Sequence, residues 1–303
     1  MKTVLFYSFK GGVGRTQSLL NIAKYLAREK NKKIAIVDFD IYAPGLSYLS
    51  SNLKEDTGKE YFLKYLVNLF QDVNSDIYAE KLEENIDLIP VYNMGNLRPY
   101  HKLLTEFSQY LYSIKGESEK RMDEISTMSD SIFEVIKEDV SKNNDYDYIF
   151  FDARTGITEV SDILFSHYVD MKIFISSYNK QNIDGTNEIL KMLSEQCISR
   201  HTILRVLSPR PNIQNDKLSE SLTKADLLTD DNHLQLRNIF DWKGTMEIPY
   251  EQEIVVNDID AWDNLDEDNP YKQSIKGIAN AINDEFDIEF DIESILDESQ
   301  NIP

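Results

Sequence analysis

The sequence predicts an α/β fold, a doubly wound and mostly parallel sheet flanked by helices. Short apolar runs that suit buried strands alternate with stretches whose apolar residues recur every three or four positions, as on one face of a helix. A glycine-rich turn joins the first of these runs to the first helical stretch, and two later runs end in aspartates. In open α/β sheets ligands gather at the carboxyl edge of the strands, so we expect these features to meet there.

Length and composition bound the class of protein. A chain of 303 residues can bury a substantial core, and its hydrophobic fraction of 41% is ordinary for a globular protein. No apolar run approaches the ~18 residues of a membrane span, and the N-terminal residues lack the pattern of a signal peptide. The single cysteine, Cys197, fits a reducing compartment. We therefore predict a cytoplasmic protein.

The charge balance indicates the kind of partner. The chain carries 32 basic and 53 acidic residues, which gives a formal net charge of −21. Such a surface repels DNA phosphates and anionic lipid. We expect a protein partner, with no membrane and no nucleic acid bound by this chain alone.

The glycine-rich stretch, residues 8–16, reads SFKGGVGRT. Glycines let the backbone adopt positive φ, so that successive N–H groups can point inward at phosphate oxygens, and the dipole of the following helix adds positive charge there. Lys10 and Arg15 supply cationic donors, and Thr16 stands where its hydroxyl can bind Mg²⁺. The stretch is predicted to be a nucleotide phosphate loop.

This string resembles the deviant Walker A motif of the ParA/MinD-type P-loop ATPases (SIMIBI class), in particular their KGGVGR-variant branch. The resemblance implies binding of ATP and Mg²⁺, with slow hydrolysis coupled to formation of a homodimer through the nucleotide face. Lys10 matches the family lysine that reaches the partner's nucleotide. The residues expected to hold the nucleotide here are Lys10, Gly11, Gly12, Val13, Gly14, Arg15, Thr16 and Gln17. Arg15 replaces the usual lysine, and a planar guanidinium follows the γ-phosphate less easily than a compact ammonium, so we expect low basal turnover.

A second buried strand ends in the pair Asp38 and Asp40. Alternate strand residues face the same way, so both carboxylates are expected at the carboxyl edge of the sheet. The pair resembles the second acidic motif of the family, in which such aspartates position the attacking water and the metal. The alternative is a helix cap or a solvated turn.

The apolar run at residues 146–151 ends in Asp152, which is the form of a Walker B strand whose carboxylate reaches Mg²⁺. The next residues resemble the D-[SA]-R-T-G string of the KGGVGR branch, and this implies that Arg154 lies near the γ-phosphate, where a guanidinium can stabilise transition-state charge. The equally weighted alternative is that Arg154 pairs with Asp38 or Asp152.

Two residues beyond a later strand, Arg210 and Asn212, are candidates for contact with the adenine base, because family members use an asparagine or arginine near prolines there. The alternative is a plain loop. The sequence does not decide firmly between ATP and GTP.

Other stretches complete the expected organisation. We predict one domain over residues 1–283, with a largely helical segment at 51–85, a strand near 85–91, a helical insertion or lid at about 96–128, and an acidic tail at 284–303. Apolar residues alternate in that tail, which favours a strand over a membrane helix. Its run of acidic residues is typical of solvated chain, and a docking segment for a partner is the alternative.

Two functions from different classes follow. The first is an ATPase whose nucleotide cycle controls a partner protein, such as a bacterial stress or phage-defence (antiviral) effector encoded beside it. The second is a nucleotide-gated scaffold that holds ATP and hardly hydrolyses it. An iron–sulfur carrier is disfavoured, because Cys197 stands alone.

Overall fold

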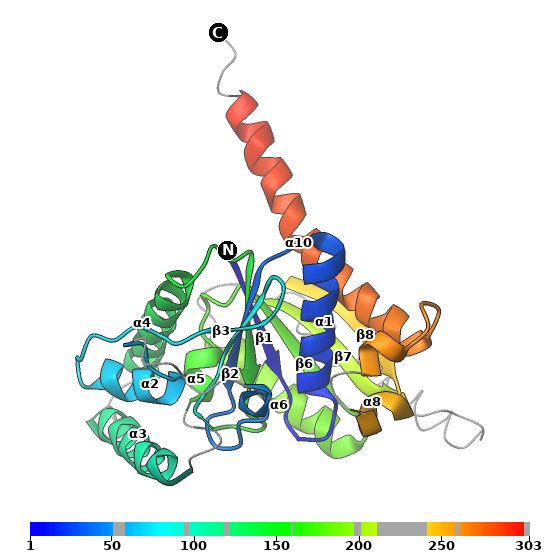
Figure 1. The fold of residues 1–303 in the computed structure, drawn as a ribbon. Helices are drawn as coiled ribbons and strands as arrows, with labels where there is room; N and C mark the ends of the chain where they lie inside the picture. The colour runs from blue at the N-terminus through cyan, green and yellow to red at the C-terminus, as the bar shows by residue number, and fades with distance from the viewer. Residues whose placement is uncertain are drawn as a thin grey trace.

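A computed structural model describes residues 1–50, 58–93, 97–117, 122–158, 160–196, 201–210, 241–257 and 261–299. Eight strands form one sheet in the order β3-β4-β2-β5-β1-β6-β7-β8, and every pairing is parallel except that of β3 with β4 (Figure 1). The strands are β1 (Lys2–Tyr7), β2 (Ile34–Phe39), β3 (Glu80–Glu83), β4 (Ile86–Ile89), β5 (Tyr148–Ala153), β6 (Met171–Ser176), β7 (Thr202–Arg210) and β8 (Asp241–Pro249).

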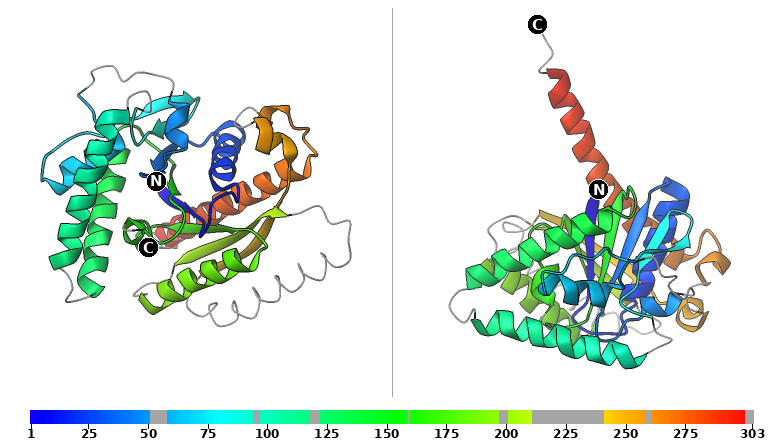
Figure 2. Two further views of the ribbon diagram at one scale, coloured as in Figure 1. Left: turned by 90° about the horizontal axis from the view of Figure 1, so that it is seen from below. Right: turned by 60° about the vertical axis from the view of Figure 1, so that its left-hand side comes forward.

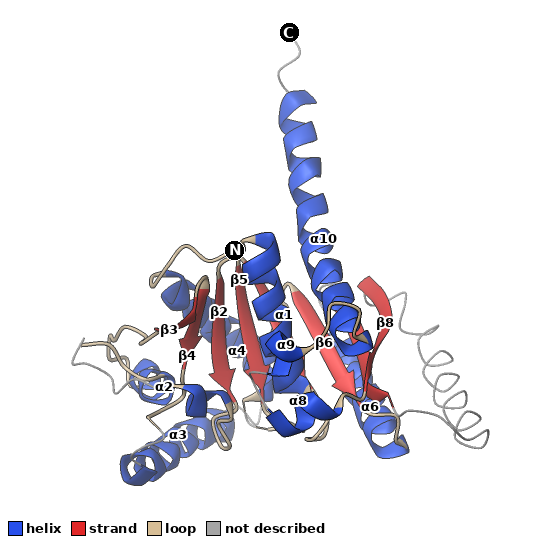
Figure 3. Ribbon diagram, turned by 45° about the vertical axis from the view of Figure 1, so that its right-hand side comes forward, coloured by secondary structure: helices blue, strands red, loops and turns tan. Residues whose placement is uncertain are grey.

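Helices cover both faces of the sheet, so the predicted doubly wound α/β fold is confirmed. The described helices are α1 (Arg15–Lys30), the short 3-10 helix η1 (Leu46–Leu49), α2 (Phe62–Phe70), α3 (Leu97–Glu117), α4 (Met122–Ser141), α5 (Ser161–Leu164), α6 (Lys180–Gln196), α8 (Gln252–Asn257), α9 (Ala261–Asn264) and α10 (Pro270–Ser299). Figure 3 shows α1, α8, α9 and α10 together on one side of the strands.

The central strands are buried on both faces, which explains why they read as continuous apolar runs. Along β1, Leu5 and Tyr7 join the core under α2, α4 and α6, while Val4 and Phe6 join the core under α1 and α10. The period of two along each strand thus divides its side chains between two cores, one on each side of the sheet.

The helical prediction for residues 51–85 was wrong over much of its described part. Only α2 is helical there, and β3 pairs antiparallel with β4 after a turn at Asn85, whose φ is +64°. Residues 51–57 lie outside the described part. The secondary structure of residues 80–83 is determined by pairing with β4 and not by local helix propensity.

The acidic tail was predicted as a strand, and this was wrong as far as residue 299. α10 continues as a helix to Ser299, and its C-terminal end projects from the body of the molecule (Figures 1 and 2). A strand that projects from the body has only water to pair with its backbone N–H and C=O groups, whereas a helix pairs most of them within itself. The expected boundary between residues 283 and 284 lies inside α10 and stays a prediction.

The region expected as a helical insertion contains α3 and the start of α4, on the left of Figure 1. The α4 residues Phe133, Ile136 and Val140 are fully buried, and they pack in the same core as β5. Helix α4 therefore contributes to the main fold, and the description of residues 96–128 as a separate lid stays a prediction.

Candidate functional site

The loop between β1 and α1 has the backbone of an anion cradle. Gly12 and Gly14 both have φ of +77°, which L-residues with side chains rarely adopt. Gly14 is the N-cap of α1 and makes no side-chain cap, so the first-turn N–H groups of a 16-residue helix receive no hydrogen bond from a capping side chain. Such groups attract an anion.

A cavity of about 230 Å³ lies over this loop. Its lining residues are Ser8, Gly11, Gly12, Val13, Gly14, Arg15, Thr16, Gln17 and Thr155. Seven of the eight residues predicted to hold the nucleotide therefore surround one space, and Lys10 is absent from the lining. Ser8, at the start of the loop, and Thr155, after β5, were not predicted to lie at the site.

The sheet register brings the acidic motifs together beside residues that line this cavity. β2 and β5 are neighbours, and Asp38 lies directly beside Asp152. The Thr16 hydroxyl donates to Oδ2 of Asp152 at 2.7 Å, which joins the first turn of α1 to the end of β5. Two of the predicted Mg²⁺ ligands, Thr16 and Asp152, thus meet, and the third, Asp38, lies on the neighbouring strand; the metal role of all three stays a prediction.

The donor set fits magnesium. No group of three or more His, Cys, Asp and Glu side chains within the described ranges is arranged to hold a metal by itself. Mg²⁺ in nucleotide sites usually takes one or two protein oxygen ligands, with phosphate oxygens and water completing the octahedron. Thr16 and Asp152 offer hard oxygens beside a phosphate-sized cavity, as this chemistry requires.

Arg15 points at the carboxylates. Its Nε donates to Oδ1 of Asp152 at 2.6 Å, its Nη1 lies 3.4 Å from the Ser8 hydroxyl, and its Nη2 lies 3.7 Å from Oδ2 of Asp40. The side chain is only 7% exposed. Sequence reasoning placed this cation against phosphate and did not anticipate the pairing with Asp152.

Asp38 is completely buried and is tied to η1. Its Oδ2 accepts hydrogen bonds at 2.8 Å from both the backbone N–H and the hydroxyl of Ser47, and the same hydroxyl accepts from the N–H of Val91. Burial, together with the nearby charge of Asp152, raises the pKa of Asp38 to about 7. Asp38 therefore links β2, η1 and the end of β4.

Asp40 is more open to solvent, with 13% of its side chain exposed. Burial raises its pKa, while the charge of Arg15 opposes that rise. Its Oδ1 accepts from the N–H of Ala43 at 3.3 Å. Asp38 and Asp40 thus both lie at the carboxyl end of β2, as expected. Of the two, only Asp40 has a side chain exposed to solvent.

Arg154 lies over an aromatic ring. Its guanidinium carbon is 4.4 Å from the centre of the Tyr42 ring, and the hydroxyl of Tyr42 lies 3.5 Å from that of Ser108 on α3. The alternative was that Arg154 pairs with Asp38 or Asp152. Among the described residues, Asp152 accepts from Arg15 and Thr16, and Asp38 accepts from Ser47, so Arg154 is not the partner of either aspartate. Proximity of Arg154 to a γ-phosphate stays a prediction.

The start of the loop is anchored to α6. The Lys10 ammonium donates to Oε1 of Gln181 at 2.6 Å from an exposed position. Phe9, which stands where the generic phosphate-loop pattern has glycine, packs over Gly185. Neither Gln181 nor Gly185 carries a local sequence signal for this role.

Arg210 is the last residue of β7, where a loop was expected. Its guanidinium forms an ion pair with Glu247 of β8, which also accepts from the Tyr178 hydroxyl. Asn212 lies outside the described residues. Contact of either residue with a base stays a prediction.

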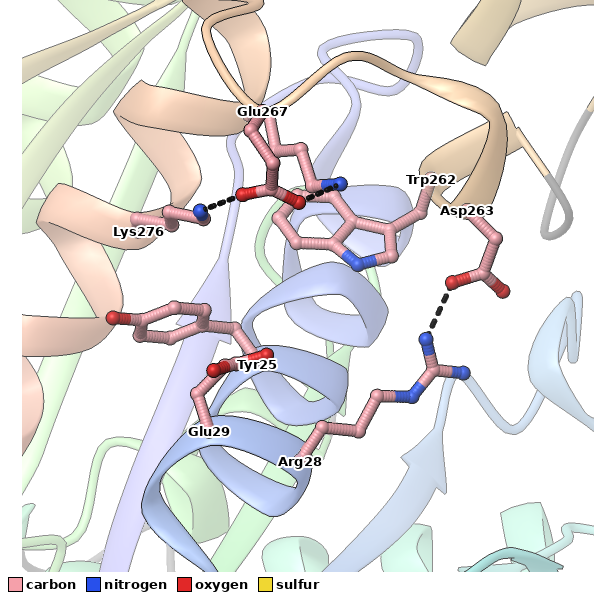
Figure 4. A pocket seen from close by; sticks show the side chains of 8 residues that line it. Tyr25, Arg28, Glu29, Trp262, Asp263, Glu267 and Lys276 are labelled. Atoms are coloured by element: carbon pink, nitrogen blue, oxygen red, sulfur yellow. Dashed lines mark hydrogen bonds and ion pairs between the residues drawn. The ribbon is translucent and has the colours of Figure 1, made fainter.

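A second cavity, of about 280 Å³, lies between α1, α9 and α10 (Figure 4). The charged groups that line it largely pair with one another. Glu267 bridges Lys272 and Lys276, and Arg28 pairs with Asp263. Charges that pair among themselves leave little to attract a ligand, so we interpret this cavity as part of a brace that holds α9 and α10 against α1.

No helix in the described parts of the chain is long and apolar enough to cross a membrane.

Comparison with known proteins identifies the fold. A model of the AAA_31 family, described as an AAA domain, matches residues 1–205. The chain is 36% identical over 90 residues to the virulence plasmid ParA family protein pGP5-D of Chlamydia psittaci. This alignment covers 30% of the chain, and the chain spans only about a third (33%) of the length of that relative.

Three solved structures share the architecture. A plasmid partition protein of Borrelia burgdorferi bound to AMPPNP gives a TM-score of 0.59 at 17% identity, covering 94% of this chain and 99% of the other. A variant of McdA from Cyanothece in complex with ATP gives a TM-score of 0.61 at 16% identity, covering 93% of this chain and 96% of the other. The cell division ATPase MinD of Pyrococcus furiosus gives 0.59 at 16%, covering 93% and 98%. The expected ParA/MinD-like P-loop fold is confirmed.

Proposed function

Since the chain belongs to the AAA domain family, whose model matches residues 1–205, we propose that it binds ATP with Mg²⁺ and hydrolyses it slowly. The nucleotide state controls a homodimer, and the homodimer acts as a switch on a partner protein. The observation that carries the proposal is the cavity over the Gly12–Gly14 cradle, with the Thr16 hydroxyl 2.7 Å from Asp152 at its edge.

Each part of the site has a task in this proposal. The backbone N–H groups of the loop bind the phosphates, and Thr16 and Asp152 hold Mg²⁺, which supplies charge neutralisation for phosphoryl transfer when bound. Asp40, on the exposed side of the acidic pair, orients the attacking water. Asp38, whose pKa lies near neutrality, is suited to exchange a proton with that water.

Slow turnover follows from how these side chains are engaged. Asp38 uses one oxygen to hold Ser47, and Asp152 is paired with Arg15. Both contacts must loosen or rearrange before the carboxylates act on water and metal. A partner protein or the second subunit supplies that rearrangement in our proposal.

Exposed apolar side chains support a homodimer at this edge. Tyr48, in η1 after β2, is 68% exposed, and Ile157, after β5, is 64% exposed. Both follow the carboxyl ends of neighbouring strands, as the nucleotide-binding residues do. Lys10 is exposed beside the same loop, where a second subunit can meet it.

The net charge of −21 favours a protein partner with a basic surface. In our proposal this partner is an effector of a bacterial phage-defence or stress system.

Calorimetry tests nucleotide binding. Wild type is expected to bind ATP with Mg²⁺, and Thr16→Ala is expected to bind it roughly tenfold or more weakly, because a ligand to the metal is lost. Thr105→Ala, at an exposed position on α3, is the matched control and should leave affinity unchanged. The same titration with GTP in place of ATP shows which base the site prefers. Absence of heat with either nucleotide would overturn the proposal.

The second candidate is the scaffold that holds ATP and hardly hydrolyses it, favoured by the pairing of Arg15 with Asp152. Phosphate release separates the two. An ATPase releases phosphate faster than its Asp40→Ala variant, alone or with a partner present, while a scaffold dimerises with ATP and releases phosphate no faster than that variant.

A further inference from the structure

The acidic motifs place two carboxylates, Asp152 and Asp40, against one guanidinium, with the carboxylate of Asp38 on the strand beside Asp152. Asp38 and Asp152 are neighbours across β2 and β5, and Asp40 follows two residues after Asp38. Of the cations described in this structure, Arg15 makes the salt bridges to this group, one to Asp152 and one to Asp40.

These charges lie where water screens them little. Asp38 is 0% exposed, Asp152 is 2% exposed and Arg15 is 7% exposed. Ionised carboxylates in such a setting are costly unless a cation or strong hydrogen bonds offset them. Arg15 and the Thr16 hydroxyl together occupy both oxygens of Asp152.

The shape of arginine matters for this contact. The Nε of Arg15 donates to Asp152, while its Nη2 faces Asp40 and its Nη1 faces Ser8. A guanidinium presents donors along a rigid plane, so one side chain can serve two carboxylates at different positions. A lysine ammonium is a single point of charge and would have to favour one of them.

The same side chain also lines the phosphate cavity. Arg15 thus lies between the carboxylates of the protein and the cavity in which we propose that the triphosphate binds. A cation in this position can neutralise one set or the other.

We infer that Arg15 is a built-in counter-cation that takes the place of Mg²⁺ at Asp152 until nucleotide arrives. The inference rests on the proposed function of the site. Asp152 and Thr16 would then hold the metal, and the guanidinium of Arg15 would turn from Asp152 toward the phosphates. Arg15 is therefore a positioning residue that makes metal and nucleotide bind together and keeps free Mg²⁺ out of the empty site.

A double-mutant cycle on nucleotide-free protein in EDTA tests the pairing. Arg15→Gln is expected to lower the melting temperature, and Asp152→Asn is expected to remove most of that loss when the two are combined. Additive effects of the two substitutions would overturn the inference. If Arg15→Gln alone does not fold, recovery of a folded protein in the double variant supports the pairing, and failure of the double variant to fold when Asp152→Asn folds contradicts it.

Mg²⁺ without nucleotide supplies a measurement that a merely structural role would not change. Wild type is expected to show little thermal stabilisation by millimolar Mg²⁺. Arg15→Gln is expected to bind Mg²⁺ about tenfold more tightly, an effect lost in the double variant, while Arg15→Lys falls between wild type and Arg15→Gln. Equal Mg²⁺ affinity in wild type and Arg15→Gln contradicts the exchange.

Failure of this inference is distinguishable from failure of the proposed function. Both experiments are made without nucleotide. ATP binding with additive effects at Arg15 and Asp152 removes the inference alone, whereas coupling between them without any nucleotide binding removes the proposed function.

Discussion

The ring of Phe9 lies so close to Gly185 that a Cβ on this glycine would stand 2.2 Å from a ring carbon. The first turns of α6 thereby hold the start of the phosphate loop, since Phe9 directly precedes Lys10 and the glycines. The contact joins residues from β1–α1 and β6–α6, two units that are distant in the sequence and adjacent in the sheet.

Gly185→Ala is expected to push Phe9 aside, to lower the free energy of unfolding by about 1–3 kcal/mol, and to weaken ATP binding by displacing the loop. Denaturant unfolding and calorimetry measure the two effects. Gly45→Ala is the matched control, because Gly45 has φ of −77° and nothing within 4 Å of its added Cβ. Equal behaviour of the two variants would mean that Phe9 yields without strain.

Ser47→Ala removes the hydroxyl that donates to Asp38 and accepts from the N–H of Val91. Both partners are buried, so we expect a loss of about 1–3 kcal/mol in the free energy of unfolding. Phosphate release should also change if Asp38 acts on the attacking water. Ser141→Ala, which removes an exposed hydroxyl bonded within its own helix, is expected to cost little. A cost as small as that control would show that Ser47 does not hold the segment.

Lys10→Ala is expected to weaken ATP-driven dimerisation and to lower turnover, because Lys10 is proposed to reach the nucleotide of the second subunit. The stability of the nucleotide-free monomer should stay unchanged, since the contact with Gln181 is exposed. Analytical ultracentrifugation with and without ATP measures the effect. Lys102→Ala, at a side chain 81% exposed, serves as the control. A Lys10→Ala protein that dimerises and turns over like wild type would remove the cross-subunit role.

His201 makes stability depend on pH. Burial, together with the charge of Lys172, lowers its pKa to about 3 from an ordinary value near 6.5. Below pH 6.5 the imidazole is protonated in the unfolded chain and stays neutral in the folded protein. Its contribution to the free energy of unfolding is therefore full above pH 6.5 and is lost as the pH falls toward 3.

This one histidine changes the free energy of unfolding by at most about 1.4 kcal/mol per pH unit. His201→Gln should flatten the fall of the melting temperature between pH 6.5 and 4.5 relative to wild type. His101→Gln, at an exposed position, should not. Identical slopes in wild type and His201→Gln would contradict a neutral buried imidazole.

Much of the fold could be predicted because its signals are local. Buried parallel strands are apolar on both faces, so β1, β2, β5 and β6 stand out in the sequence without any knowledge of their neighbours. The phosphate loop is equally local, since positive φ at Gly12 and Gly14 and the following N-terminus of α1 arise from consecutive residues. Because β2 and β5 run parallel, Asp38 and Asp152 lie at the same edge of the sheet.

The contacts that distinguish this site depend on tertiary structure. Arg15 and Asp152 are separated by 137 residues, and only the order of strands in the sheet decides that Nε lies 2.6 Å from the carboxylate. Whether the tail forms a strand or a helix depends on whether a neighbouring strand is available, and the period of its apolar residues cannot supply that. The sequence by itself determined an α/β sheet with a phosphate-binding loop after its first strand. The packing of distant segments decided that Arg15 faces Asp152, because side-chain pairing depends on distance in space.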